Sequence, residues 1–338
     1  MLNIQRNISL AKYTTLKVGG AARFFCEAKS EKEILEAVKF AEEKNLPVFV
    51  LGGGSNILVN DQGFSGLVIK ILNTKHEIRN TIVECGAGAS LSKIVQESIK
   101  AGLTGLEWAA GIPGTVGGAV RGNAGAFGGC MAEVVHSVKV IEIPNFSKAR
   151  LFPSAKQVGG ISQSQALKSQ LPITNYQLRE CEFAYRESVF KQNPNLIILS
   201  VTLKLKKGDR KKSEELLKEI LEERKKSQSI YPSPGSFFKN PIVKDEKLIK
   251  EFEIDTGQKI KDKKIPAGYF IDRAGLKGKK IGSAMVGEEH ANFIVNTGNA
   301  TAENVVILAA IVKTRVRNKF GIQLKEEVQM VGFEKKVL

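Results

Sequence analysis

Cysteine and histidine are scarce in this chain of 338 residues, and both are scattered along it. No CxxC pair occurs among the cysteines, which are Cys26, Cys85, Cys130 and Cys181. The three histidines form no HExxH or HxH pattern. Because disulfide frameworks and zinc sites need a suitable set of Cys or His ligands, we expect neither of them, and no bound metal.

Long apolar runs are also missing. No segment approaches the roughly 20 apolar residues that a membrane-spanning helix needs. The N-terminal sequence MLNIQRNISLAKYTT contains no apolar stretch of signal-peptide length. We therefore expect a cytoplasmic protein with no membrane partner.

Aromatic residues are few, with a single tryptophan, whereas the formal net charge is +16. Such a positive field attracts anions, which include nucleic acids and small ligands with several phosphates. The chain shows no basic module with interleaved aromatic residues, so we expect no nucleic-acid partner. Positive charge is concentrated at 258–280, with eight Lys or Arg against two acids. An ordinary lysine-rich surface explains the net charge equally well.

Hydrophobic periodicity predicts a mixed α/β chain. A helix is expected over 30–47, where Ser30 and Glu33 match a capping box and one face carries Ile34, Leu35, Val38 and Ala41. The remaining expected elements are strands at 48–53, 66–71 and 81–89, a helix at 90–103, strands at 136–143 and 195–205, helices at 211–228 and 303–319, and a final strand at 322–333. The segment 146–178 lacks a clear period, and we interpret it as a surface embellishment rather than a lid.

Two glycine-rich segments allow a ligand to approach the backbone closely. LGGGSN at 51–56 follows a predicted strand, and its glycines permit positive φ angles that direct successive N–H groups at a diphosphate. The segment matches neither GxGxxG nor GxxxxGKS/T. WAAGIPGTVGGAVRGNAGAFGG at 108–129 is dominated by small residues and suits contact with a flat ligand. The two segments together suit one extended dinucleotide, and two unrelated loops are the alternative.

Three further positions are candidates for chemistry. Arg186 lies in the apolar frame of CEFAYRESVFK, which suits either an ion-pair partner or a bidentate grip on a carboxylate. Ser236 follows the turn-rich YPSPG and has no GxSxG elbow or neighbouring histidine, so it is a poor hydrolase nucleophile, but its hydroxyl is able to protonate a carbanion. Glu326 and Glu327 are adjacent in the predicted final strand and point to opposite faces, and alternation alone does not choose between them.

Eight motifs follow one another along nearly the whole chain: YTTLKVGGAARFF (13–25), LGGGSNILVNDQGFSGLVIK (51–70), GLEWAAGIPGTVGGAVRGNAGAFG (105–128), FAYRESVF (183–190), PSPGSFFKNP (232–241), AGYFIDRAGLKG (267–278), HANFIVN (290–296) and LKEEVQMVG (324–332). In this order they resemble the UDP-N-acetylenolpyruvoylglucosamine reductase family, flavoenzymes of bacterial peptidoglycan synthesis. Each motif is modest alone, and their order carries the resemblance.

The resemblance implies an α+β fold, in which a vanillyl-alcohol-oxidase or PCMH-type FAD-binding domain precedes a C-terminal α+β substrate-binding domain. The expected boundaries are 1–210 for the FAD-binding domain (subdomains at about 1–72 and 73–210), 211–320 for the substrate domain, and 321–338 for a C-terminal strand and tail with Glu327. The implied reaction is the NADPH-dependent reduction of UDP-N-acetyl-3-O-(1-carboxyvinyl)-glucosamine, a UDP-sugar, to UDP-N-acetylmuramate. We expect a monomer.

The resemblance also implies roles for individual residues. Hydride from flavin N5 would reach C3 of the enolpyruvyl group, Arg186 and Glu327 would stabilise the enolate, and Ser236 would protonate C2. The implied FAD contacts are Gly52, Gly53, Gly54, Ser55, Asn56, Gly111, Ile112, Pro113, Gly114, Thr115, Gly117, Gly118, Asn123, Ala124 and Gly125. The implied substrate contacts are Tyr185, Lys239, Asn240, Lys277 and His290, and the basic segment 258–280 would help to hold the uridine diphosphate.

The sequence departs from the family's pattern in two places. VTLKLKKGDRKKSEELLKEI runs directly from a strand to a helix, which implies the form that lacks the tyrosine-bearing loop. The segment 146–178 is longer than the family's usual link. The alternative function is that of another FAD-dependent oxidoreductase of the same fold, acting on a small hydroxy acid or alcohol, which shares the glycine-rich turns but does not need Arg186, Ser236 and Glu327 together.

Overall fold

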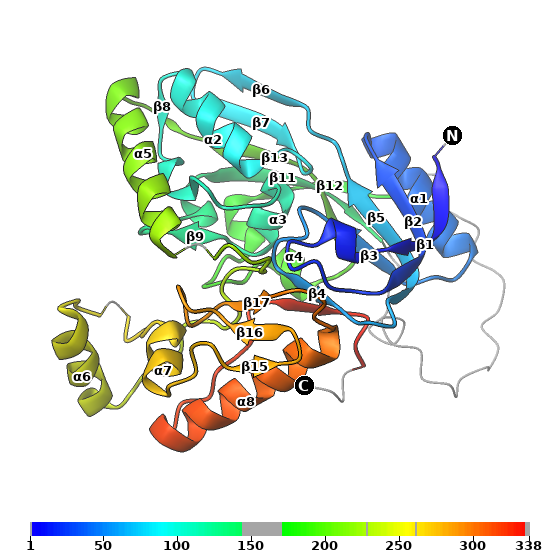
Figure 1. The fold of residues 1–338 in the computed structure, drawn as a ribbon. Helices are drawn as coiled ribbons and strands as arrows, with labels where there is room; N and C mark the ends of the chain where they lie inside the picture. Colours follow the sequence, from blue (N-terminus) through cyan, green and yellow to red (C-terminus); the bar gives the residue numbers. More distant parts are fainter. Residues whose placement is uncertain (1, 144–170, 228, 261, 335–338) are drawn as a thin grey trace.

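The chain folds as two sheet-containing units packed side by side, with a third unit beneath them (Figure 1). The computed structural model describes residues 2–143, 171–227, 229–260 and 262–334. The expectation for 146–178 therefore lies largely outside the described residues. Within these ranges, none of the helices combines the length and the apolar character that crossing a membrane requires.

The first unit is a four-stranded sheet in the order β1-β2-β5-β3. Its strands are β1 (Ile4–Ser9), β2 (Ala21–Ala28), β5 (Phe64–Ile71) and β3 (Val48–Leu51). β1 is antiparallel to β2, whereas β2, β5 and β3 run parallel. Parallel pairing needs crossover connections, and α1 (Glu31–Glu43) supplies the one between β2 and β3.

Helix α1 confirms the predicted helix but not its full capping box. The Ser30 side chain accepts a hydrogen bond from the Glu33 N–H, as expected for an N-cap. The Glu33 carboxylate accepts its bond from the Lys29 N–H at 2.5 Å, one residue before the N-cap. Leu35 is only partly buried, because Ala37 shares the innermost face with Ile34 and Val38.

The second unit is a five-stranded antiparallel sheet in the order β12-β11-β13-β7-β6. Its strands are β6 (His76–Arg79), β7 (Ile82–Gly86), β11 (Val135–Glu142), β12 (Ile173–Gln177) and β13 (Leu196–Lys204). The helices of this unit are α2 (Leu91–Lys100), α3 (Val116–Arg121), α4 (Val189–Gln192) and α5 (Arg210–Ser227). The helix expected over 90–103 ends at Lys100, because Gly102 takes a positive φ of 71° and β8 (Leu103–Thr104) follows.

Helix α5 packs against the second unit. Its Ile220 belongs to the apolar core that spans both sheets and includes Ile34 of α1 and Ile94 of α2. The Ser213 hydroxyl on α5 donates to the buried Glu107 carboxylate at 2.6 Å. Only the short β14 (Lys206–Lys207) stands between β13 and α5, so no tyrosine-bearing loop is inserted there, as predicted.

The third unit contains the sheet β15-β16-β17 and three helices. Its elements are α6 (Glu246–Thr256), α7 (Ala267–Arg273), β15 (Lys280–Ile281), β16 (Ala284–Val286), β17 (Ile294–Asn296) and α8 (Ala302–Phe320). The apolar face of α8, which includes Val305, Leu308 and Val312, lies in a separate core. Leu16 and Leu58 from the first part of the chain are fully buried in the same core, so the units are packed together.

The last strand is shorter than predicted. β18 (Gln329–Val331) pairs in parallel with β4 (Ile57–Val59), which lies 272 residues earlier in the chain (Gln329 pairs with Ile57). The residues from 322 to 328 are not in a regular strand, although Glu326 forms an isolated bridge with Phe238. Glu327 therefore lies before the strand rather than inside it. The remaining short elements are the 3-10 helices Ala11–Tyr13, Glu107–Ala109, Met131–Glu133 and Leu178–Cys181, and the hairpin strands β9 (Gly125–Ala126) and β10 (Gly129–Cys130).

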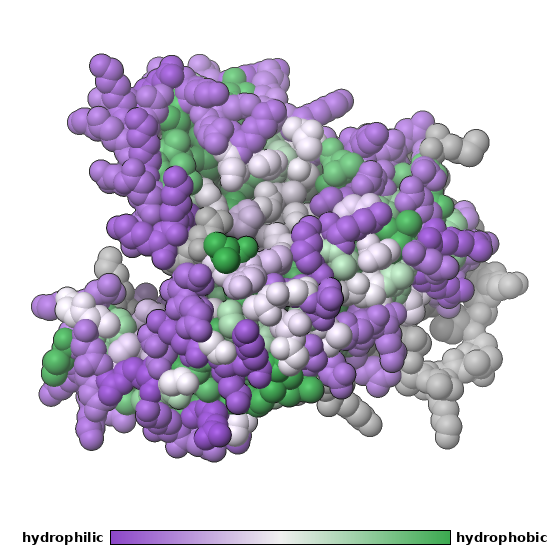
Figure 2. Space-filling model, in the orientation of Figure 1, coloured by the Kyte–Doolittle hydropathy of each residue, from purple (hydrophilic) through white to green (hydrophobic). Residues whose placement is uncertain are grey.

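Hydrophilic side chains cover the outer parts of the face shown in Figure 2. Paler, less hydrophilic residues gather across the middle of this face, where the upper units meet the lower one (Figures 1 and 2). The middle of the molecule is thus the region where a ligand can contact less polar protein surface.

Candidate active site

The two glycine-rich segments are packed directly against each other. A Cβ atom at Gly53 would lie 2.5 Å from the Gly114 Cα, and one at Gly52 would lie 2.7 Å from the Thr115 Oγ1. The Ser55 hydroxyl donates to the Pro113 carbonyl at 3.0 Å and links the same two loops. The loops are therefore parts of one structure, and the interpretation as two unrelated loops is wrong.

Hydrogen bonds to neighbouring residues fix each glycine-rich loop. The second loop leads into α3, whose N-cap Thr115 accepts a hydrogen bond from the Gly118 N–H at 3.3 Å. In the first loop, the Lys70 ammonium donates to the Gly52 carbonyl. Burial lowers the pKa of Lys70. This side chain places a cation beside the loop that we expect to face phosphate groups.

A cavity of about 400 Å³ lies between the two sheet units and reaches the glycine-rich loops. Its volume falls in the range typical of ligand pockets. Gly52, Thr115, Gly117 and Gly118 are the predicted cofactor residues that line it. The walls also contain apolar residues from β3 and β13 and a group of polar residues: Val50, Leu196, Ile198, Arg121, Lys191 and Gln329. A ligand with both flat apolar and polar parts suits these walls.

Other predicted cofactor residues contact protein. Gly111 faces Leu221 and Arg224 of α5, and Gly125 lies against Cys130 in the β9–β10 hairpin. Ile112 and Ala124 donate their N–H groups to the carbonyls of Ala109 and Ala119. The cradle for a ligand is thus centred on the loop tips rather than on the ends of the glycine-rich segments.

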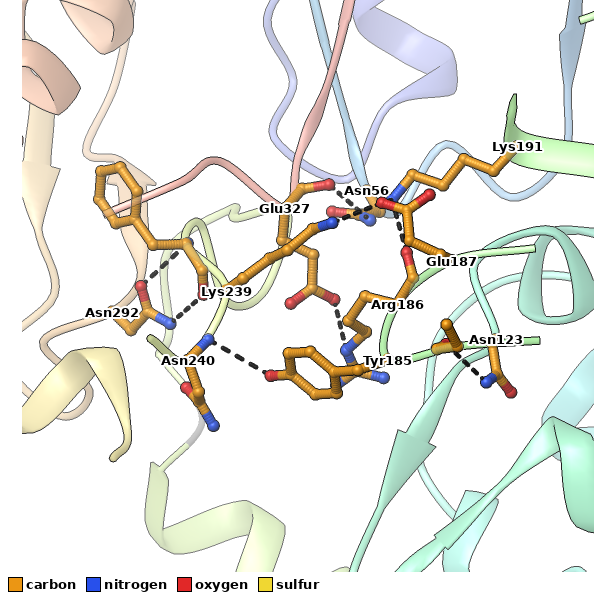
Figure 3. Close-up of polar contacts among 12 residues, drawn as sticks. Asn56, Asn123, Tyr185, Arg186, Glu187, Lys191, Lys239, Asn240, Asn292 and Glu327 are labelled. Atoms are coloured by element: carbon orange, nitrogen blue, oxygen red, sulfur yellow. Dashed lines mark hydrogen bonds and ion pairs between the residues drawn. The ribbon is translucent and has the colours of Figure 1, made fainter. Parts of the chain in front are cut away.

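Arg186 and Glu327 form an ion pair at the centre of the site, with 2.9 Å between Nε and Oε1 (Figure 3). Both side chains are largely buried, with 23% and 14% of their surface exposed. Nε and Oε1 are within ion-pair distance, although the N–H of Arg186 is not well aligned with the carboxylate oxygen. Of the two adjacent glutamates, Glu327 faces Arg186, whereas Glu326 pairs with Lys313 of α8 at 2.6 Å.

Burial raises the pKa of Glu327 above its ordinary value, and this effect outweighs the nearby positive charges of Arg186, Lys191 and Lys239. Removal from water disfavours the ionised carboxylate, while adjacent cations favour it. A neutral Glu327 is able to donate a hydrogen bond to an anion held by Arg186, whereas an ionised one would repel it.

Ser236 lies on the segment that holds Glu327. Its backbone forms a bridge with Phe293, and the next carbonyl, that of Phe237, accepts the Glu327 N–H at 2.8 Å. The Asn292 side chain fixes Phe238 by donating to its carbonyl and accepting from its N–H, at 2.9 and 3.0 Å. Within the described ranges the Ser236 hydroxyl has no hydrogen-bond partner, which leaves it available to a ligand.

Two asparagines from the glycine-rich segments brace the catalytic candidates. The Asn56 amide donates to the Glu327 carbonyl at 3.4 Å, and the Asn56 carbonyl accepts the Gln329 N–H at 3.0 Å. The Asn123 amide donates to the Ala184 carbonyl at 2.9 Å, just before Tyr185 and Arg186. These predicted cofactor residues therefore connect the glycine-rich segments to the Arg186–Glu327 pair.

The predicted substrate residues near this pair already have protein partners. Lys239 Nζ donates to Glu187 at 2.6 Å. The Asn240 side-chain oxygen accepts the Ala267 N–H at the start of α7. The backbone N–H of Asn240 donates to the Tyr185 hydroxyl at 3.3 Å. The expectation that both Lys239 and Asn240 reach substrate oxygens thus requires Lys239 to exchange partners, whereas the Asn240 oxygen is used as a helix cap.

Lys277 and His290 both belong to the third unit, between α7 and β17. Lys277 pairs with Asp272 at 2.9 Å. His290 accepts the Asn292 N–H at 3.2 Å and stacks on Phe293, and burial lowers its pKa. Much of the charge at 258–280 is likewise paired with acids, in the ion pairs Lys263–Glu246, Lys264–Asp262, Arg273–Asp255 and Lys277–Asp272.

Several residues of the site were not predicted from the sequence. Glu187, the neighbour of Arg186 in the sequence, forms ion pairs with both Lys191 and Lys239, at 3.5 and 2.6 Å (Figure 3). The i,i+4 spacing of Glu187 and Lys191 was a signal for that pair. The Lys264 Nζ lies 4.6 Å from the centre of the Tyr185 ring, and no local sequence pattern predicted this contact. Among the described residues, no group of three or more His, Cys, Asp or Glu side chains is arranged to hold a metal ion.

Comparison with known proteins identifies the family. Residues 22–145 match the FAD binding domain family, and residues 225–331 match the C-terminal domain of UDP-N-acetylenolpyruvoylglucosamine reductase. A reductase of that name from Solibacter usitatus is 35% identical over 98% of this chain and 97% of its own length. The chain belongs to the UDP-N-acetylenolpyruvoylglucosamine reductase family. Another such reductase, from Synechococcus sp., is 37% identical over 98% of this chain and 94% of its own length.

The fold of this reductase family member agrees with a solved relative. The crystal structure of the UDP-N-acetylenolpyruvylglucosamine reductase from Thermus caldophilus superposes with a TM-score of 0.72. It is 32% identical and covers 98% of this chain and 100% of its own chain. The predicted fold class, an FAD-binding domain followed by the family's C-terminal domain, is confirmed.

Proposed function

We propose that this chain reduces the enolpyruvyl ether of UDP-N-acetylenolpyruvoylglucosamine to UDP-N-acetylmuramate, with FAD as cofactor and NADPH as reductant, in peptidoglycan synthesis. The observation that carries the proposal is the ion pair of Arg186 and Glu327, held by Phe237 beside Ser236 and close to the glycine-lined cavity. The family membership supplies the substrate.

FAD fits the residues that are present. Substituted side chains at Gly52 and Gly53 would collide with the facing loop, so these glycines keep a close backbone cradle for a diphosphate. The apolar walls from β3 and β13 suit a flat ring system, and the polar lining residues Arg121, Lys191 and Gln329 suit its heteroatoms. When bound there, FAD supplies the hydride that it has received from NADPH.

The chain's own residues bind and polarise the enolpyruvyl group. Addition of hydride at C3 leaves negative charge on C2 and its carboxylate. Arg186 holds this carboxylate, and protonated Glu327 donates a hydrogen bond to it, so both interactions strengthen as the charge develops. Ser236 then transfers its hydroxyl proton to C2. No histidine is required, because the carbanion is a strong base.

The remaining substrate contacts follow from the surroundings of this pair. We propose that Tyr185, Lys239, Asn240, Lys277 and His290 line the path of the sugar nucleotide, with the basic residues at 258–280 toward the diphosphate. Lys239 exchanges Glu187 for a substrate oxygen on binding, and Asn240 positions α7. Lys264, which lies against Tyr185, adds a cation on this path.

We also propose a domain division after α5. The packing of Ile220 with the two sheets supports a place for α5 in the cofactor-binding part, with the boundary at the end of the helix at Ser227 instead of residue 210. Subdomains at about 1–72 and 73–210 correspond to the two sheets. We propose that the protein is monomeric and cytoplasmic, where its nucleotide substrates are available; size-exclusion chromatography and cell fractionation test these two points.

A substitution at Ser236 should affect only one of the two half-reactions. In Ser236→Ala, we expect NADPH to reduce the bound FAD at close to the wild-type rate, because this step needs no proton from Ser236. Reoxidation by the enolpyruvyl sugar nucleotide is expected to slow by about 100-fold or more. Stopped-flow absorbance of the flavin measures both steps.

Ser233→Ala is the matched control. Ser233 lies in the same turn, where its hydroxyl accepts the Gly235 N–H at 3.4 Å, and both half-reactions should remain nearly unchanged. Equal slowing of both steps in Ser236→Ala would make Ser236 structural. Failure of the sugar nucleotide to reoxidise the flavin in the wild type, together with flavin reduction by a small hydroxy acid or alcohol, would favour the alternative oxidoreductase.

A further inference from the structure

Arg121 is a charged residue of the cavity wall that the proposed reaction does not use. It is the last residue of α3 and is one of the residues that line the cavity. Its Nη1 donates to the Gln329 side-chain oxygen at 2.9 Å, which is a neutral acceptor. A guanidinium offers five N–H donors and stays charged in proteins, so this single bond leaves most of its capacity unused.

The charge of Arg121 is not balanced by a neighbouring acid. Glu187 is the acidic residue that acts on it electrostatically, and Lys191 is a further cation nearby. The Glu187 carboxylate is already shared by Lys239 and Lys191, at 2.6 and 3.5 Å. Within the described ranges Arg121 forms no ion pair, so a positive field remains at this part of the cavity wall.

The contacts of Arg121 indicate which part of a bound cofactor it would face. The glycine-rich loops meet at Thr115, and α3 places Arg121 six residues later, about 9 Å along the helix axis. Its carbonyl accepts the Ser188 hydroxyl at 2.7 Å, and its partner Gln329 is two residues from Glu327. These two hydrogen bonds therefore connect Arg121 to the segments that carry Arg186 and Glu327, at the opposite end of α3 from Thr115.

We propose that Arg121, oriented by Gln329, binds the electron-rich pyrimidine edge of the flavin ring and raises its reduction potential. The inference rests on the proposed function only in that FAD occupies the cavity. Two-electron reduction places additional negative charge on this edge of the ring. A fixed cation beside it stabilises the reduced cofactor more than the oxidised one, as charges near the ring nitrogens are known to do.

The test is the midpoint potential of the bound FAD, measured by spectroelectrochemical titration of the holoenzyme against a reference dye. In Arg121→Met, the equilibrium should shift toward oxidised FAD by about tenfold, which for a two-electron couple is about 30 mV more negative. Arg121→Lys keeps the charge and should retain most of the wild-type potential. Arg79→Met is the matched control, since Arg79 is an exposed arginine paired with Glu77 on β6, and it should change nothing.

Gln329→Glu provides an independent measurement that keeps Arg121 in place. A carboxylate at this position neutralises the guanidinium, so the potential should fall as in Arg121→Met. If Arg121→Met does not fold, this variant decides the question. An unchanged potential in Gln329→Glu, or equal losses in the Lys and Met variants at position 121, overturns the proposal.

The experiment also separates this inference from the proposed function. The potential is measured without NADPH and without the sugar nucleotide. A wild-type protein that binds FAD but does not reduce the sugar nucleotide contradicts the proposed function and leaves the role of Arg121 testable. An unchanged potential in the variants contradicts only the role of Arg121.

Discussion

Arg186 combines an unusual backbone with a charged side chain. Its φ of 58° lies in the left-handed region, which costs a residue with a Cβ on the order of 1 kcal/mol or more. The turn is closed by the hydrogen bonds between Ala184 and Glu187, and Asn123 holds it from the glycine-rich segment. This surrounding structure imposes the conformation that directs Arg186 toward Glu327.

The protonation of Glu327 should be visible in the pH dependence of stability. Burial raises its pKa, so the native protein keeps Glu327 protonated to a higher pH than the unfolded chain does. The contribution of Glu327 to the free energy of unfolding is complete below the ordinary carboxyl pKa, which applies to the unfolded chain. It is lost as pH rises through the raised pKa of the native protein. We expect Glu327→Gln, which cannot ionise, to gain in Tm relative to the wild type across this window.

Thermal unfolding followed by circular dichroism at a series of pH values measures this difference. Glu326→Gln is the matched control, because Glu326 lies next in sequence but pairs with Lys313. A Tm difference for Glu327→Gln that stays constant or narrows as pH rises would mean that the pKa of Glu327 is not raised in the native protein.

At the scale of elements, the cofactor site depends on the close approach of two loops. Alanine at Gly53 would place a Cβ 2.5 Å from the Gly114 Cα, and backbone cannot move aside as a flexible side chain can. We expect Gly53→Ala to separate the loops and to weaken FAD binding by at least tenfold. Fluorescence titration of the apoprotein with FAD measures the affinity.

Gly122→Ala is the control for this prediction. Gly122 has an ordinary negative φ of −87°, and a Cβ there would meet the Gly118 carbonyl oxygen at 3.6 Å, a normal contact. Its FAD affinity should stay close to that of the wild type. Equal affinities for Gly53→Ala and the wild type would show that the contact of the two loops does not shape the cofactor site.

Local patterns predicted most of the elements because each was determined by its own residues. The helix expected over 303–319 is α8 (Ala302–Phe320), which has a Thr301 N-cap and ends before Gly321. The expected strand over 322–333 was mostly wrong, because Gln329–Val331 forms a strand only where β4 is present as a partner. The opposite directions of Glu326 and Glu327 were nevertheless predicted, since an extended chain alternates even outside a regular sheet.

The site was less predictable than the fold, because its contacts join distant parts of the chain. Arg186, Ser236 and Glu327 were found through the order of the motifs, and the structure connects them through Phe237 and an ion pair. The network of Glu187 with Lys239 and Lys191 depends on a loop-to-loop distance that no local pattern encodes. Arg121 was read as part of a glycine-rich segment, and only the cavity gives it a separate role.

At the scale of the whole molecule, the cores are joined. Leu58 of β4 is fully buried in the core of the C-terminal unit, while its neighbours Ile57 and Val59 lie in another apolar cluster beside the first sheet. We expect Leu58→Ala to destabilise the protein by about 2–5 kcal/mol and to lower the Tm of a single cooperative transition. Differential scanning calorimetry measures the transition.

The matched control is Leu216→Ala on α5, where the leucine is 44% exposed and its loss should change the Tm little. A wild-type protein with two separate transitions, of which Leu58→Ala shifts only one, would show that the units unfold independently.

The pairing of β4 with β18 also has a consequence for synthesis on the ribosome. Asn56 and Glu327, which this pairing brings together, are 271 residues apart. At about 5–20 residues per second, roughly 15 to 50 seconds pass between their translation. During that time the nascent chain can complete both sheets, yet β4 has an open edge and the ion pair of the active site does not exist. A chain that stalls late in translation is therefore a nearly folded protein with no activity, and its free strand edge is a candidate for recognition by chaperones.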